Sequence, residues 1–502
     1  ARIASFPRTA QARAMSEIDP SGATGNARRR RSRNLSRSCG LKDATYVGAG
    51  MVLADADADT ALLESRRPPA QFQATQGRRP DEDDHSAGDR HVVGEEGLVA
   101  LAMARPKSLL LLLGVALALG ACTTYGVVDN ARLDAGRQGA VYSLGEFARN
   151  PTRHSGELTL AVAFSGGGTR AAALSYGVMQ ELRDTRVHID GRDTSLLEAI
   201  NVISSVSGGS FTSAYYGLYG NRIFVDFEER FLRSDVEGAL LRGLLNPLRW
   251  FSSQGRTEMA VSYYEQSLFG DATFADLARR DAPLILINSS DLSTGGRFSF
   301  VQEYFDLLCS DLSSFPLARA VTASSAVPVI FEPVVVENYS GCALGMPPWL
   351  VAAKRRNSDS AYLRMVVQDD LAYQNKVANR YAQFVDGGIT DNLGLRALLD
   401  AVELAGGAEQ YARMLPVASR RIAIISVNAA ADSPAGIGES NRAPSFGQTM
   451  NAVTDVQLHR YNVATLLQTQ QSLERWSREL STPDRPVSSY FVRLSFEDVP
   501  DP

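Results

Sequence analysis

The stretch from Ile203 to Ser210 reads ISSVSGGS and places four serines and two glycines at one boundary of the sequence. An apolar run, 199–203, leads into it and is typical of a short buried strand. The segment 211–219 follows it with a helix-like pattern. A strand that passes through a tight, glycine-flanked turn into a helix lifts one side chain off the end of a sheet. The stretch therefore predicts an α/β fold that presents a serine at a strand end.

Two frames of this turn match the G-x-S-x-G pattern of a nucleophile elbow, each imperfectly. In the better frame Ser207 takes the nucleophile position and Ser205 replaces the first glycine. The glycines of the turn are then Gly208 and Gly209. The second frame is centred on Ser210 and puts a bulky phenylalanine where the turn is tightest. We therefore expect Ser207 to be the reactive serine.

Strand-like and helix-like segments alternate through the rest of the chain. Such alternation predicts a parallel sheet covered by helices on both faces. Strands are expected at 158–164, 199–203, 284–287, 421–427 and 490–494, and helices at 171–182, 392–404 and 450–476. A mostly helical insertion is expected between 211 and 280. Its segment 240–251 mixes apolar residues with arginines, so it either packs on the core or lies on a lipid surface.

Two further glycine-rich stretches lie at expected strand ends. Gly166, Gly167 and Gly168 follow the strand 158–164, and their backbone N–H groups could stabilise an oxyanion. The spacing fits neither a P-loop nor a dinucleotide-binding loop. Downstream, Asp386 follows an apolar pair and precedes two glycines. A carboxylate at that turn could accept a serine proton or bond its own backbone.

The motifs together resemble those of the patatin-like phospholipase family. They are SGGGTR (165–170), SVSGG (205–209), NSSDLSTG (288–295), ASSAVPVIF (323–331) and DGG (386–388). The resemblance covers about residues 158–400. It implies a three-layer α/β/α fold with a mainly parallel central sheet.

The resemblance also implies a Ser–Asp dyad without histidine, in which Ser207 is the nucleophile and Asp386 the general base. Gly166, Gly167 and Gly168 would form the oxyanion hole, and Arg170 would position that loop or an anionic head group. The implied activity is that of a lipid acyl hydrolase of the phospholipase A or lysophospholipase type. Such a serine carboxylic-ester hydrolase would act through an acyl-enzyme on phospholipid or another acyl ester at a membrane surface.

Two other functions remain open. Ser207, Asp386 and His459 have the chain order of an α/β-hydrolase triad, although His459 lies in a helix-like stretch rather than after a strand. The loss of the first elbow glycine at Ser205 also leaves open a catalytically inactive envelope lipoprotein that binds lipid or protein.

The N-terminal fifth of the chain differs in composition from the rest. A basic segment begins at Met103, and an apolar run follows it and leads to small residues just before Cys122. This order resembles the signal peptide and lipobox of a bacterial lipoprotein. That resemblance implies a lipid on Cys122 and a place in the cell envelope, at the outer membrane facing the periplasm. We expect four segments: 1–102, disordered or a translation of upstream sequence; 103–121, the signal peptide; 122–157, the lipidated cysteine and a tether; and 158–502, the acyl hydrolase domain.

Composition excludes several classes of function. With a net charge of -5, the chain gives no sign of the basic face that nucleic-acid binding needs. Its five histidines and four cysteines lack metal-ligand spacing, so we expect neither a metal site nor a cofactor. Cys309 and Cys342 are the only cysteines after Cys122, and in an oxidising compartment they either pair or remain free thiols.

Overall fold

The computed structural model describes residues 126–134, 142–234, 236, 255–278, 282–328, 330–341, 345–356, 360–430, 437–439 and 441–498. Every structural statement below concerns these residues. The expected segment 1–102, the signal peptide, Cys122 and the stretch 240–251 lie outside them, so what we infer there stays a prediction.

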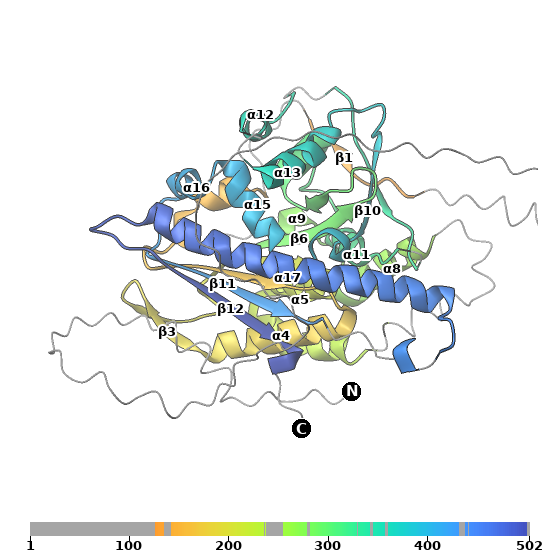
Figure 1. Ribbon diagram of the computed structural model, residues 1–502, viewed down its shortest axis with the longest axis horizontal. Coiled ribbons are helices and arrows are strands. Elements are labelled where there is room, and N and C mark those ends of the chain that lie inside the picture. Colours follow the sequence, from red (N-terminus) through yellow and green to blue (C-terminus); the bar gives the residue numbers. More distant parts are fainter. Residues whose placement is uncertain are drawn as a thin grey trace, which may run out of the picture. The chain divides into compact units, whose positions relative to one another are not determined.

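An eight-stranded sheet forms the middle layer (Figure 1). In sheet order its strands are β12 (Ser488–Ser495), β11 (Arg421–Asn428), β2 (Leu158–Phe164), β5 (Ile200–Val206), β6 (Leu284–Asp291), β10 (Tyr381–Asp386) and β9 (Val334–Glu337), and β7 (Arg297–Ser299) pairs with β6. The five strands from β12 to β6 are parallel. Only β10, β9 and β7 introduce antiparallel pairs. The expected mainly parallel sheet is confirmed.

Helices cover both faces of this sheet. Two residues of β2 that lie three positions apart show the two faces, because successive side chains of a strand point in opposite directions. Phe164 lies against the start of α5 (Gly208–Tyr219), which packs with α4 (Gly168–Asp184). Ala161 instead faces the layer of α15 (Arg396–Ala405) and α17 (Phe446–Leu480). The fold is therefore three-layered.

The remaining elements surround these layers. The helices are α3 (Leu144–Arg149), α6 (Ile223–Phe227), α8 (Arg256–Tyr264), α9 (Phe274–Leu277), α10 (Gln302–Leu307), α11 (Leu317–Ser325), α12 (Pro348–Arg355), α13 (Ala361–Ala372), α14 (Gly388–Asp391) and α16 (Ala408–Met414). Two small pairs of strands are β1 (Ala131–Arg132) with β8 (Ser310–Asp311), and β3 (Arg186–Ile189) with β4 (Arg192–Ser195). None of the described helices is long and apolar enough to cross a membrane.

Several sequence predictions differ from the structure in their boundaries. The expected helix 392–404 begins only at Arg396, because the chain first forms the short helix α14 and a turn. The expected tether ends before residue 157, because Tyr142 and α3 are built into the domain. The Tyr142 hydroxyl donates to the carbonyl oxygen of Ile285, and Ala148 of α3 is buried.

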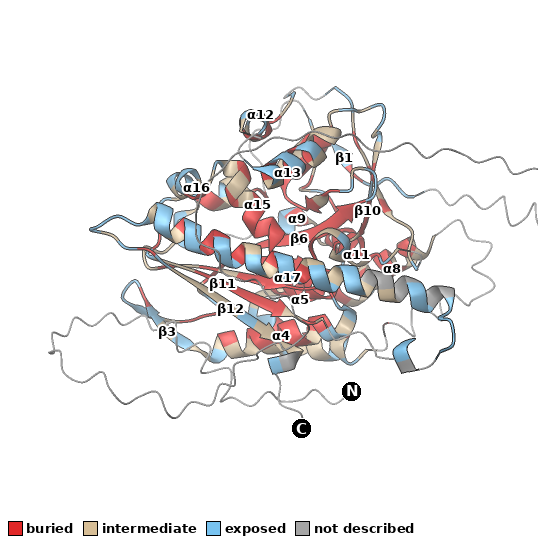
Figure 2. Cartoon of the chain, in the orientation of Figure 1, coloured by how far each residue is buried: buried red, intermediate tan, exposed pale blue. Residues whose placement is uncertain are grey.

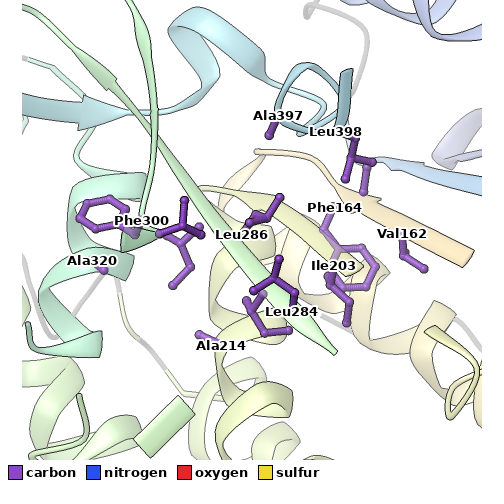
Figure 3. Packing of buried hydrophobic residues seen from close by; sticks show 14 of the residues in the cluster. Val162, Phe164, Ile203, Ala214, Leu284, Leu286, Phe300, Ala320, Ala397 and Leu398 are labelled. Atoms are coloured by element: carbon purple, nitrogen blue, oxygen red, sulfur yellow. The ribbon is translucent and has the colours of Figure 1, made fainter. Parts of the chain in front are cut away.

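Buried side chains concentrate in the central strands and on the inner faces of the helices (Figure 2). Val162 of β2 and Ile203 of β5 are directly paired in register, and both are fully buried (Figure 3). Full burial of one such aliphatic side chain contributes about 1.5–3 kcal/mol. The hydrophobic core therefore holds the ends of β2 and β5, which carry the glycine loop and ISSVSGGS, side by side.

A buried ion pair joins β7 to α15. Arg297 donates from Nη2 to Oδ2 of Asp400 at 2.5 Å, and the two side chains are 7% and 4% exposed. The hydroxyl of Tyr362 donates to the other carboxylate oxygen of Asp400, also at 2.5 Å. Removing one partner of such a pair leaves an uncompensated buried charge.

Asp400→Ala should therefore lower the free energy of unfolding by about 3–5 kcal/mol, since Arg297 stays buried without its counter-ion. Urea denaturation measures the change. Asp193→Ala is the matched control, because Asp193 pairs with His188 on the surface and an exposed pair contributes at most about 1 kcal/mol. Equal losses in the two variants would contradict this interpretation of the Arg297–Asp400 pair.

Candidate active site

Ser207 occupies the sharp turn between β5 and α5. Its backbone has φ 49° and ψ -122°, a region that residues with a side chain rarely adopt. A Cβ atom on Gly208 would lie 1.9 Å from the carbonyl oxygen of Gly168, and one on Gly209 would lie 2.7 Å from Cβ of Phe164. Both glycines are therefore required, because the elbow packs backbone to backbone against the glycine loop.

The Ser207 hydroxyl points at Asp386. Its Oγ donates a hydrogen bond of 2.8 Å to Oδ2 of Asp386. The register of the sheet explains this contact, because Val206 pairs with Asn288 and Asp386 pairs with Ser289 on the two sides of β6. Two residues that are 179 positions apart thus meet at one edge of the sheet.

The other three serines of ISSVSGGS are engaged in the interior. The Ser205 hydroxyl bonds Ser213 Oγ at 2.6 Å, the Ser210 hydroxyl bonds Ser324 Oγ at 2.9 Å, and Ser204 Oγ accepts from Asn288 Nδ2 at 2.9 Å. Ser205 is fully buried and fits the position of the missing glycine without strain. Of the four serines, only Ser207 reaches a carboxylate.

Asp386 is the last residue of β10, and its second carboxylate oxygen, Oδ1, also accepts a hydrogen bond. The backbone N–H of Gly388 donates to Oδ1 at 2.7 Å. Burial raises the pKa of the Asp386 carboxyl to about 6, while the hydrogen bonds from Gly388 and Ser207 act in the opposite direction. The carboxylate is therefore a stronger base than an ordinary aspartate, and it stays ionised at neutral pH.

The end of α11 supports Ser207 and Asp386, a role that the sequence did not indicate. Ser324 Oγ accepts from the backbone N–H of Ser207 at 2.9 Å and donates to the carbonyl oxygen of Asn288 at 2.6 Å. The backbone N–H of Asp386 donates to the carbonyl oxygen of Ala326 at 2.9 Å. The stretch ASSAVPVIF contained the signal, but only the fold shows which of its atoms act.

The glycine loop differs from the prediction at one position. The backbone N–H of Gly166 donates to the carbonyl oxygen of Asn392 at 2.9 Å, so it is engaged in holding the loop. The N–H groups of Gly167 and Gly168 donate to no atom of the described chain, and both residues are exposed. Their φ angles of 137° and 63° favour glycine. Gly167 and Gly168 are thus the residues of this loop that have free donors.

The other predicted site residues fall in different places. Arg170 is exposed on the first turn of α4 and forms no hydrogen bond or ion pair with the described residues. His459 is exposed on α17 and takes no part in the direct Ser207–Asp386 hydrogen bond. Cys309 is disulfide-bonded, and its expected partner Cys342 lies outside the described residues. The described part of the chain holds no cluster of three or more potential metal ligands.

A family comparison covers the part of the chain that holds this site. Residues 162–399 match the family model of patatin-like phospholipases. This part of the chain is a patatin-like phospholipase domain. No curated protein matches the chain. The patatin-like domain contains the glycine loop, Ser207 and Asp386, whereas β11, β12 and α17 lie beyond the matched residues and extend its fold. The family supports a general assignment as a lipid acyl hydrolase.

Two substitutions test the elbow geometry of the patatin-like domain. Ser205→Gly should keep the reactivity of Ser207 toward a fluorophosphonate probe and lower stability by about 1 kcal/mol, because it loses the Ser213 hydrogen bond. Gly208→Ala should abolish labelling, because its Cβ meets the Gly168 carbonyl oxygen. Labelling rates and thermal unfolding measure both effects. Normal labelling of Gly208→Ala would show that the two loops do not pack as described.

Proposed function

We propose that the domain hydrolyses acyl esters of phospholipids with a Ser207–Asp386 dyad through an acyl-enzyme. The observation that carries the proposal is the direct 2.8 Å hydrogen bond from Ser207 Oγ to Asp386. A nucleophile that contacts its base directly needs no histidine between them. The strained backbone of Ser207 supports the same role, because such strain clusters at functional sites.

In the first step, Ser207 Oγ attacks the ester carbonyl carbon and passes its proton to Asp386. The carbonyl oxygen becomes an oxyanion, which accepts from the free N–H groups of Gly167 and Gly168. Each such donor is typically worth about 2.7–4 kcal/mol in the transition state. The N-terminus of α5 adds a favourable dipole at Ser207. The intermediate then expels the alcohol, which takes the proton from Asp386.

In the second step, water attacks the acyl-enzyme and gives its proton to Asp386. The tetrahedral intermediate collapses, releases the fatty acid and returns a proton from Asp386 to Ser207 Oγ. The same carboxylate thus acts as base and acid in turn. Its raised pKa suits both roles, because the proton is neither too weakly nor too strongly held.

The surroundings of the dyad support a lipid substrate. Val327, Ile330 and Ile389 are 43%, 57% and 51% exposed, and all three lie in segments that adjoin Asp386. Apolar side chains in such positions suit contact with the acyl region of a membrane. The exposed guanidinium of Arg170, two residues after Gly168, suits a phosphate head group. A lipid on Cys122, in the envelope location expected from the sequence, would keep the domain at such a surface.

The dyad predicts a specific pattern of inactive variants. Ser207→Ala and Asp386→Asn should each lower kcat for phospholipid or short-chain ester hydrolysis by about 10³-fold or more, since nucleophile and base act as one unit. His459→Ala is the control and should keep wild-type activity, because the side chain is exposed on α17. A loss in His459→Ala as large as that in Ser207→Ala would favour a triad. Equal, background activity of wild type and Ser207→Ala would favour an inactive lipid-binding protein.

The pKa of Asp386 predicts the pH dependence. Asp386 must be ionised to accept a proton, so kcat/KM should rise with pH and level off above about 6. An ordinary aspartate, with a pKa of about 3.9, would place the midpoint of this rise near that pH. A pH series of ester hydrolysis at saturating and low substrate measures the midpoint. A midpoint near that of an ordinary aspartate, or the same limb in the residual activity of Asp386→Asn, would contradict the assignment of the base.

A further inference from the structure

A cavity outside the dyad lies between the sheet and the helices α3, α12, α15 and α16. It has two adjoining lobes of about 270 and 110 Å³, which share the wall residues Leu144, Leu286, Ala401 and Tyr411. Neither lobe is lined by Ser207, Asp386 or the glycine loop. The larger lobe exceeds the ~150 Å³ of an engineered apolar cavity that binds benzene. The fold thus contains a second space of ligand size.

Small side chains of α15 create this space. Ala397, Ala401 and Ala405 line the larger lobe and follow one another at four-residue intervals, so they share one helix face. Leu286 of β6 lies opposite this face, below Ala397 (Figure 3). Most of the wall is apolar, which favours an aliphatic occupant over a sugar or a nucleotide.

Two buried polar atoms of this wall lack a partner. The indole Nε1 atoms of Trp349 and Trp476 are inaccessible and donate to no described residue. Trp349 lines the larger lobe, and Trp476, only 5% exposed, lines the smaller one. Buried indole N–H groups usually find an acceptor. An oxygen of the occupant would reach either N–H group only after a shift of the wall side chains.

The charges of the wall indicate where an anionic group fits. Arg297 is neutralised by Asp400, and Glu303 accepts from the backbone N–H groups of Leu144 and Gly145. The larger lobe therefore offers no free cation, whereas Arg485 lines the smaller lobe and donates to the carbonyl oxygen of Ala418.

The rim of the cavity does offer cations. Ala352 of α12 lines the larger lobe and is exposed, and it lies one turn from Trp349. Lys354 and Arg355 follow in the last turn of α12, exposed and without an ion pair to the described residues. An anion at this rim would lie near the positive charge of Arg355, one turn after Ala352.

We propose that the two-lobed cavity binds a long-chain fatty acid. The aliphatic chain lies along the alanines of α15, and the carboxylate lies at the rim beside Trp349 and the end of α12. This site is separate from the catalytic one. Leu286 pairs with Ser204, three residues before Ser207, which is a separation of about 10 Å along a strand. The proposal does not rest on hydrolysis, because binding needs no turnover.

Tryptophan fluorescence tests the proposal directly. The chain has three tryptophans, so the full-length Trp250→Phe/Ser207→Ala variant retains only Trp349 and Trp476, the two that line the cavity. Titration with a brominated stearate should quench this fluorescence in a saturable way. Absence of saturable quenching would overturn the proposal.

Filling the cavity supplies the matched comparison. In that background Ala401→Phe should weaken stearate binding at least about tenfold, which corresponds to 1.4 kcal/mol. Ala378→Phe, on an exposed loop, should not change it. Ala405→Phe is a second filling variant at a half-buried position, in case Ala401→Phe unfolds. Fluorophosphonate labelling of the same variants with Ser207 restored reports whether each remains folded. Wild-type affinity in a folded filling variant would overturn the proposal.

Charge reversal tests the position of the head group. Lys354→Glu/Arg355→Glu should weaken binding of the brominated stearate about tenfold and leave binding of its uncharged methyl ester unchanged. An equal effect on both ligands, or none on either, would contradict the placement of the carboxylate at α12.

Discussion

The close contact between the Ser207 elbow and the glycine loop is the constraint on which the candidate site depends. A Cβ atom on Gly208 would lie only 1.9 Å from the carbonyl oxygen of Gly168, so position 208 accepts no side chain. This approach places the glycine loop directly against the turn that carries Ser207. The unfavourable backbone of Ser207 persists because its N–H is held by Ser324, whose hydroxyl is fixed in turn by the carbonyl oxygen of Asn288. Strain at the nucleophile is thus supported by β6 and α11.

The electrostatics of Asp386 follow from the same packing. Burial favours the neutral acid and raises its pKa to about 6, which is above the value in an unfolded chain. The folded state therefore binds this proton more tightly than the unfolded state does. Stability from this group falls as the pH rises from about 3.9 to 6, and ionised Asp386 carries the full penalty at neutral pH. The hydrogen bonds from Ser207 and Gly388 reduce this penalty, so the arrangement that makes a good base also lowers stability.

Much of the site could be predicted from sequence because its motifs are local. The expected strand 158–164 matches β2 residue for residue, and the glycines after Ser207 correctly predicted a tight turn there. The contributions of Ser324 and Asn392 were not, because each acts on a residue more than a hundred positions away. The engagement of the Gly166 N–H was hidden for the same reason. The hairpin of β3 and β4 has a local turn signal at Asp190-Gly191. Its strands are short and polar, so they lack the alternation of apolar and polar residues that predicts a strand.

The central claim is that Ser207 forms the acyl-enzyme. Rapid acid quenching of the protein during hydrolysis of a slow phospholipid or ester substrate, followed by peptide mass mapping, tests it most directly. The account predicts that the mass of the acyl chain appears on the peptide that contains Ser207, with fragment ions that assign it to that residue. An acyl group on Ser205 or Ser210, or turnover by a protein that never carries one, would contradict it.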